Sequence, residues 1–323
     1  MDIVILLSIT LLIYLLPQNK EYLCVKSTSG LRGFLALGII FHHLSPWVTT
    51  GSEFSNFSYM GAYIVSIFFF LSAYGLYNQN ENKKNYLDKF LVTRLSKILL
   101  PFFAVSFIYL LYRFVDGQLL DLNFFISLFK NGSTIIFNGW FVNVIILLYI
   151  FFYTSFNFLQ NKLLSIILNS ILIIFYICLA IKMGYGFWWY NSTLAFILGL
   201  IWAKYQDVID KVLDRYYFVV LFSVAVLLFV SHHYGNLLRY LHIEDSYSYA
   251  LAANINNIIF TIYFVVSFLK KINFSNVFLI LLGGISFELY MIHGLVISML
   301  GKIFVSSPVN DVLLTFFTLI ISI

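Results

Sequence analysis

Residues 31–44 read Leu31-Arg32-Gly33-Phe34-Leu35-Ala36-Leu37-Gly38-Ile39-Ile40-Phe41-His42-His43-Leu44. This run is apolar enough to belong to a helix that crosses a bilayer, which takes about 20 such residues, and we expect the span at residues 31–48. An ionisable side chain near the bilayer centre costs about 2.5–3.5 kcal/mol. Arg32, His42 and His43 are therefore candidates for a functional site.

The spacing of these groups selects one pair. Arg32 and His43 are eleven residues apart, about 20° beyond three helical turns, so they share one face about 16 Å apart along the axis. His42 points roughly 80° away from Arg32. Gly33 and Gly38 would let a neighbouring helix or a ligand approach the backbone closely. Two simpler interpretations stay open: Arg32 extends to the membrane interface, and His43 forms a hydrogen bond between helices.

The composition of the whole chain indicates a membrane protein. Of its 323 residues, 61% are hydrophobic and only 10% are charged, against about half and a quarter in soluble domains. Lipid must therefore be the main solvent. Cys24 and Cys178 form no CxxC motif, so neither a zinc site nor another metal site is expected. No basic run with interleaved aromatic residues suggests nucleic-acid binding.

The sequence predicts an all-α, polytopic transmembrane helix bundle in one domain, residues 1–323. It has about ten core helices in residues 31–323 and one extra N-terminal helix in residues 1–17, which we interpret as retained because no small-x-small cleavage site follows it. Apolar stretches of near-spanning length define eleven candidate spans: residues 3–16, 31–48, 60–77, 98–115, 135–155, 163–181, 187–203, 216–231, 248–269, 277–300 and 308–323.

The basic residues orient the bundle. One alternate set of loops holds 14 of the 19 Lys and Arg residues and the other set holds 5. Because cytoplasmic loops carry the excess of Lys and Arg, we expect a multi-pass cell-membrane protein with its N-terminus outside and its C-terminus in the cytoplasm.

Polar groups in other spans are weaker candidates. Ser72 stands among small residues, which is most often a helix-packing seam. Arg94 and Lys97 open a span three residues apart, so they are neighbours on one helical face. They would either bind phosphates of a cytoplasmic ligand or anchor the helix at the interface. Tyr290 and His293 share a stripe with Ser286, which fits a site and a structural polar seam equally well.

Taken in order, these motifs resemble the acyltransferase family 3 membrane proteins, which O-acylate surface polysaccharides, peptidoglycan and related acceptors. The matching elements are Leu31-Arg32-Gly33 through His43, Phe69-Phe70-Leu71-Ser72, Arg94-Leu95-Ser96-Lys97 with Pro101, Asn138-Gly139-Trp140-Phe141-Val142, Phe196-Ile197-Leu198-Gly199, and Ile285-Ser286-Phe287-Glu288-Leu289-Tyr290-Met291-Ile292-His293. Each motif is loose, but the ordered set covers residues 31–293.

The resemblance implies a core of about ten helices that uses cytoplasmic acetyl-CoA or another acyl-CoA. The acceptor would be a polysaccharide or a lipid-linked glycan on the outer side of the bilayer. Arg32 and His43 would match the essential arginine and histidine of the family, and Arg94 with Lys97 would match a cytoplasmic basic motif. The chain departs from the pattern at Lys97, where arginine is common, and after Trp140, where no glutamate follows.

For the chemistry we expect a membrane O-acyltransferase, in the first instance an O-acetyltransferase. Acyl transfer to a hydroxyl needs a base and stabilisation of the developing oxyanion. His43 is the candidate base, and Arg32 would hold the donor or fix the site electrostatically. Candidates for lining the pocket are Ser72, Trp140, Tyr290 and His293. Transfer either directly or through an acyl-enzyme on Ser72 or Tyr290 stays open.

The competing interpretation is a transporter or flippase of a lipid-linked saccharide, since many spans and intramembrane charge fit that class as well. Such a protein would more naturally have repeat symmetry and broken helices, and the sequence indicates neither. A purely structural membrane subunit would leave the alignment of Arg32 with His43 unexplained.

Overall fold

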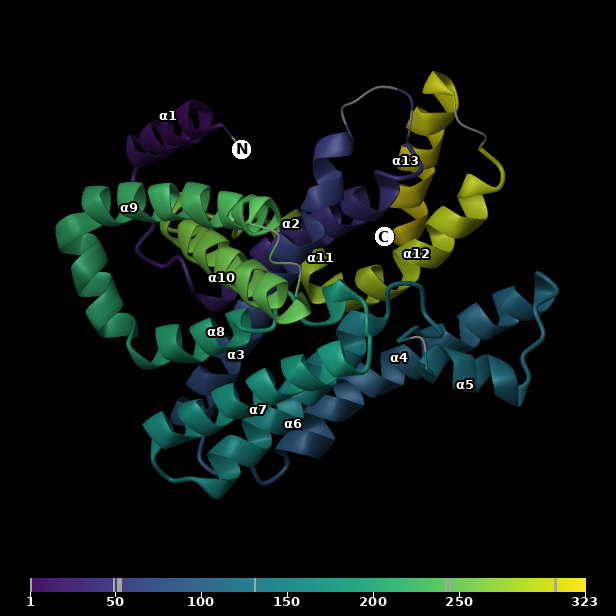
Figure 1. Ribbon diagram of the computed structural model, residues 1–323, viewed down its shortest axis with the longest axis horizontal. Helices are drawn as coiled ribbons and strands as arrows, with labels where there is room; N and C mark the ends of the chain where they lie inside the picture. Colours follow the sequence, from purple (N-terminus) through teal and green to yellow (C-terminus); the bar gives the residue numbers. More distant parts are fainter. Residues whose placement is uncertain are drawn as a thin grey trace.

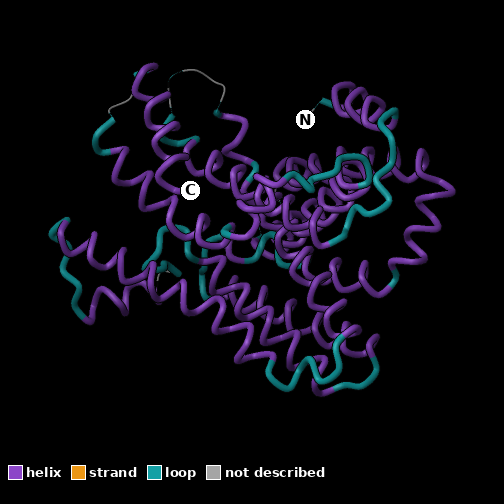
Figure 2. Tube along the Cα trace, turned by 180° about the vertical axis from the view of Figure 1, so that it is seen from behind, coloured by secondary structure: helices purple, strands orange, loops and turns teal. Residues whose placement is uncertain are grey.

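The apolar chain folds almost entirely into helices, as the sequence predicts. The computed structural model describes residues 2–48, 50, 54–130, 132–241, 243, 245–304 and 307–323, with the backbone alone at 129, 235, 236 and 239. Within these ranges there is no strand, and loops join the helices directly (Figure 1, Figure 2). The all-α fold class is confirmed.

Thirteen α-helices and three short helical segments make up the described chain. The α-helices are α1 (Ile3–Tyr14), α2 (Val25–Leu44), α3 (Gly61–Asn82), α4 (Phe90–Val115), α5 (Leu122–Lys130), α6 (Trp140–Phe158), α7 (Lys162–Lys182), α8 (Ala195–Lys204), α9 (Gln206–Tyr240), α10 (Ser246–Phe264), α11 (Val277–Gly284), α12 (Ser286–Gly301) and α13 (Pro308–Ser322). Two 3₁₀ segments cover Ser55–Tyr59 and Phe187–Trp189, and a π-helical turn covers Val265–Leu269.

Side-chain caps begin several of these helices. Asn161 accepts hydrogen bonds from the backbone of Leu163 and Leu164 at the start of α7. At α13 the Ser307 side chain accepts from the backbone of Asn310, and Pro308 occupies the first turn. Such caps satisfy backbone donors that have no partner within the helix. Helices α2 and α4 begin at residues 25 and 90, earlier than the predicted spans. Cys24 caps α2 by accepting from the backbone of Ser27, whereas α4 begins without a side-chain cap.

Six helices of the described chain are long and apolar enough to cross a membrane: α3, α4, α6, α7, α9 and α10. The pair α11 and α12 makes a seventh candidate if it counts as one span, although its halves are bent by 74°. Helices α1, α8 and α13 are shorter apolar helices. The span predicted over residues 277–300 is therefore not one straight helix but a pair of helices broken at Ile285. The segment between the predicted spans 187–203 and 216–231 is helical as well, because α9 begins at Gln206 and is kinked at Tyr216.

The break between α11 and α12 lies at Ile285, which leaves helical geometry with φ −109° and ψ 12°. The Ser286 hydroxyl donates a hydrogen bond of 3.0 Å to the carbonyl oxygen of Gly283, so it takes over an acceptor at the end of α11. The new direction brings the first turn of α12 to the wall of the cavity described below.

Helix α2 lies in the middle of the bundle and packs against α3, α11 and α12 (Figure 1). Its crossing with α11 is unusually close. A Cβ atom on Gly33 would lie 2.1 Å from the carbonyl oxygen of Leu279, and one on Gly283 would lie 1.9 Å from that of Ser29. Only glycine permits this approach. The close crossing holds α2, and with it Arg32 and His43, against α11.

The extra N-terminal helix belongs to the packed structure. Helix α1 contacts α9 and the π-helical turn, and Thr10 on α1 shares a hydrogen bond of 2.9 Å with the Tyr263 hydroxyl. Lys271 donates to the carbonyl oxygens of Tyr14 and Leu16 at the end of α1.

Candidate active site

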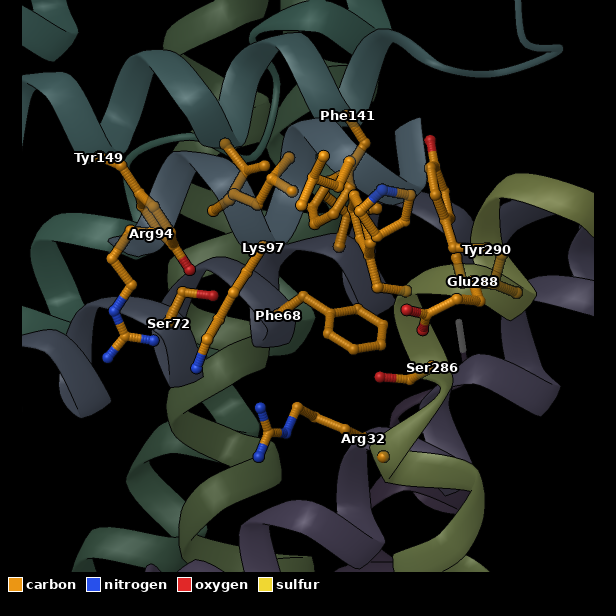
Figure 3. Close-up of a pocket in the computed structure, with 18 of the residues that line it drawn as sticks. Arg32, Phe68, Ser72, Arg94, Lys97, Phe141, Tyr149, Ser286, Glu288 and Tyr290 are labelled. Carbon is orange, nitrogen blue, oxygen red and sulfur yellow. The ribbon is translucent and has the colours of Figure 1, made fainter. Parts of the chain in front are cut away.

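A cavity of about 580 Å³, here called the central cavity, lies between α2, α3, α4, α6 and α12. Arg32 from α2, Ser72 from α3, and Arg94 and Lys97 from α4 line it together. Figure 3 shows the charged groups of Arg32, Arg94 and Lys97 gathered at one end of the cavity near Ser72, while Glu288 lies toward the other end with Tyr290. Four of the residues singled out from the sequence thus meet at one place.

The cations of the central cavity are not neutralised by carboxylates. Arg94 donates from Nη2 to Gln79 Oε1 at 2.6 Å and to the Tyr86 hydroxyl at 2.7 Å, and both acceptors are neutral. Burial raises the pKa of Tyr86, so its phenol stays protonated at neutral pH. Arg32 and Lys97 make neither a hydrogen bond nor an ion pair with the described residues, whose three ion pairs lie elsewhere. Cations without ion-pair partners suit an anionic ligand.

A second cavity, of about 370 Å³, continues the positive charge and is here called the lysine cavity. Lys83 and Lys89 line it, and Arg94 and Lys97 belong to its wall and to that of the central cavity. The two spaces therefore adjoin, with five cationic side chains along them, which suits a ligand carrying several phosphate groups.

A third cavity, of about 320 Å³, holds His42, His43, Asn138 and Trp140 and is here called the histidine cavity. Arg32 and His43 both lie on α2, as expected, but they line different cavities rather than one. Ile39, Val65 and Tyr290 line both the central cavity and the histidine cavity. These three residues form the junction between the cationic end and the imidazole end.

His43 is held between two polar neighbours. Its Nδ1 lies 3.2 Å from Nδ2 of Asn138, and its ring stacks on that of His293 with centroids 5.0 Å apart and an interplanar angle of 28°. The Asn138 amide presents a donor in this orientation and would present an acceptor after a 180° turn. With the acceptor facing Nδ1–H, the Nε2 lone pair of His43 would be free to take a proton.

His293 lies behind His43 and lines none of these cavities. It is fully buried, and its Nδ1 donates to the Leu289 carbonyl oxygen at 2.9 Å. Its Nε2 has no hydrogen-bond partner among the described residues. The sequence singled out His293 for the pocket; its position supports a role in orienting His43 instead.

Tyr290 connects the two cavities to a sharp turn before α6. Its hydroxyl donates a hydrogen bond to the carbonyl oxygen of Asn138. Asn138 has a positive φ of 60°, in the left-handed region that asparagine tolerates better than most residues. The turn therefore presents its carbonyl oxygen to Tyr290 and its side chain to His43.

Four residues of the histidine cavity were given no role in the site that the sequence predicted. His42 lies off the Arg32 stripe, yet it lines the histidine cavity, and its Nδ1 donates to the Phe57 carbonyl oxygen at 2.9 Å. Asn138 stood in a motif without an assigned role. Trp188 and Asn191 come from the connection between α7 and α8, where no helical spacing could indicate which way they point.

The fold and the cavities define a polytopic membrane protein with a polar site enclosed by its helices. Comparison with family models assigns it further: the model described as an acyltransferase domain matches residues 26–323, and the chain belongs to this family, acyltransferase family 3. It is therefore a membrane acyltransferase, and the resemblance seen in the sequence is confirmed. Comparisons with curated proteins and with solved structures found no match.

Proposed function

We propose that the chain is a membrane O-acyltransferase. It would move an acyl group, acetyl in the first instance, from cytoplasmic acyl-CoA to a hydroxyl of a cell-envelope or exported polysaccharide. One observation carries the proposal: unpaired cations lie at one end of α2 and imidazoles at the other, and Ile39, Val65 and Tyr290 join the two cavities.

The cationic end suits the donor. Arg32, Arg94 and Lys97 surround the central cavity, and the lysine cavity extends their charge. An acyl-CoA carries several phosphates on a long, less polar arm. The remaining wall of the central cavity is mostly apolar, with Phe68 and Phe141 among its residues. Such a wall suits the less polar arm of acyl-CoA, which would extend toward Ile39, Val65 and Tyr290.

The imidazole end suits the transfer step. His43 would accept the proton of the acceptor hydroxyl as its oxygen forms a bond to the thioester carbonyl carbon. The carbon–sulfur bond then breaks, and the protonated His43 returns the proton to the leaving thiolate. Arg32 lies about 16 Å away along α2, so we assign it to donor binding rather than to this proton transfer.

A transporter or flippase of a lipid-linked saccharide is the alternative function. The break between α11 and α12 is a feature that many transporters share, and it was not predicted. Membership of the acyltransferase family favours the enzyme.

The function is tested with the purified protein in liposomes, radiolabelled acetyl-CoA and envelope fractions. We expect the label to become covalently attached to glycan and to be released by mild alkali, as an ester is. Movement of a labelled saccharide across the bilayer without consumption of acetyl-CoA would establish the transporter instead.

Donor binding should depend on Arg94. We expect Arg94→Gln to raise the KM for acetyl-CoA about 10- to 100-fold, because a hydrogen bond to a charged group is worth about 1.5–3 kcal/mol. Calorimetric titration with CoA should give the same factor in Kd. The control is Arg215→Gln, since Arg215 is exposed and lines none of the three cavities. Equal donor affinity in both variants would remove Arg94 from the donor site.

A further inference from the structure

The connection between α7 and α8 contributes two side chains to the histidine cavity. Trp188 and Asn191 line it beside His43. Neither residue has a role in the transfer step described above. Both come from a segment without regular helical spacing, which contains only the short 3₁₀ segment Phe187–Trp189.

This segment is held firmly by side chains of two neighbouring helices. From α10, Asn254 donates to the Tyr190 carbonyl oxygen and Asn257 donates to that of Asn191, both at 2.8 Å. From α7, the Tyr176 hydroxyl donates to the Trp189 carbonyl oxygen at 3.0 Å. Three consecutive carbonyl groups are thereby fixed, so the positions of the adjoining side chains are set before any ligand enters.

Asn191 carries an unused hydrogen-bonding group. The residue is only 7% exposed, and its Oδ1 is buried without a hydrogen-bond partner among the described residues. Buried polar groups are nearly always paired, and an unpaired one at the wall of a cavity is suited to a donor that arrives with a ligand. A hydroxyl group is such a donor.

Trp188 supplies a flat apolar surface beside this polar group. Its side chain is 55% exposed, and its indole packs against Gly186, where a Cβ atom would lie 2.4 Å from Cζ2 of the ring. The glycine therefore sets the position of the indole. A half-exposed tryptophan beside amide and imidazole groups offers a ligand an apolar surface next to hydrogen-bonding partners.

We propose that Trp188 and Asn191 form the acceptor subsite and that its occupant is a sugar ring; this inference rests on the proposed function. The C–H face of the ring lies on the indole, one hydroxyl donates to Asn191, and another reaches His43. A lipid alcohol carries one hydroxyl, and with that group at His43 it would leave Asn191 Oδ1 without a partner. A site built for several hydroxyl groups rejects a ligand that lacks them.

Binding is tested without the donor. The protein in nanodiscs is titrated with the methyl glycosides of glucose, galactose, N-acetylglucosamine and rhamnose, with cyclohexanol as the ring lacking the other hydroxyls, and followed by saturation-transfer NMR. We expect at least one glycoside to bind with strong transfer to its ring C–H protons, and cyclohexanol to give none.

Variants then locate the site. Trp188→Ala and Asn191→Ala should each weaken glycoside binding about tenfold, the loss of one aromatic contact or one hydrogen bond. Gly186→Ala should weaken it too, because its methyl group displaces the indole. Trp47→Ala is the matched control, since Trp47 is 41% exposed but lines none of the three cavities.

The outcomes separate the subsite from the proposed function. Glycoside binding equal to that of cyclohexanol, or binding unaffected by both Trp188→Ala and Asn191→Ala, would overturn the subsite even if the protein consumes acetyl-CoA. Glycoside binding that depends on Trp188 and Asn191 supports the subsite, and failure to consume acetyl-CoA in the same preparation would then refute the enzyme alone.

Discussion

His43→Ala should lower kcat for acyl transfer by about 10²- to 10⁴-fold, the usual contribution of a general base. The expected loss falls on kcat because the alanine removes the group that takes the hydroxyl proton, while Arg32, Arg94 and Lys97 still line the central cavity and bind the donor. The measurement is the rate of label transfer from acetyl-CoA, together with the Kd of CoA, which should stay unchanged.

The control for this variant is an exposed imidazole on the same protein, that of His232. His232 lies 3.2 Å from the Tyr63 hydroxyl through its Nδ1 and lines none of the three cavities. His232→Ala should therefore retain kcat. Transfer at the wild-type rate by His43→Ala would exclude His43 as the base, and His42 of the same cavity would become the next candidate.

The sequence was most informative where one helix carries the whole pattern. Arg32 and His43 both lie on α2, so counting residues along one helix was enough to relate them, although they line different cavities. Arg94 and Lys97 share the start of α4 in the same way. Apolar length predicted the helices themselves, because each apolar stretch must satisfy its backbone groups internally in lipid.

What the sequence did not reveal depends on contacts between segments. No periodicity indicates that α12 turns by 74° from α11 at Ile285. The spacing argument did not select His42, because it compared every residue of the helix with the direction of Arg32 alone. Nothing local places Trp188 or Asn191, which depend on distant Asn257 and Tyr176 for their position.

The close crossing of α2 and α11 gives the largest expected effect on stability. Gly283→Ala would put a methyl group 1.9 Å from the carbonyl oxygen of Ser29 and 2.7 Å from its carbonyl carbon. Both are backbone atoms, so no side chain can rotate away and the helices must separate. Overpacking costs about 1–3 kcal/mol or more, and we expect at least the upper end. The thermal midpoint in detergent should fall on the order of 10 °C.

The neighbouring glycine provides the matched control. A Cβ atom on Gly284 would meet no atom within 4 Å, and alanine is favoured over glycine in a helix by up to about 1 kcal/mol. Gly284→Ala should thus keep the wild-type midpoint or raise it slightly. Because α2 carries both Arg32 and His43, separation of α2 from α11 in Gly283→Ala should also weaken CoA binding. Equal thermal midpoints for Gly283→Ala and Gly284→Ala would mean that α2 and α11 do not cross as closely as described. The arrangement of the central cavity and the histidine cavity along α2 would then be wrong as well.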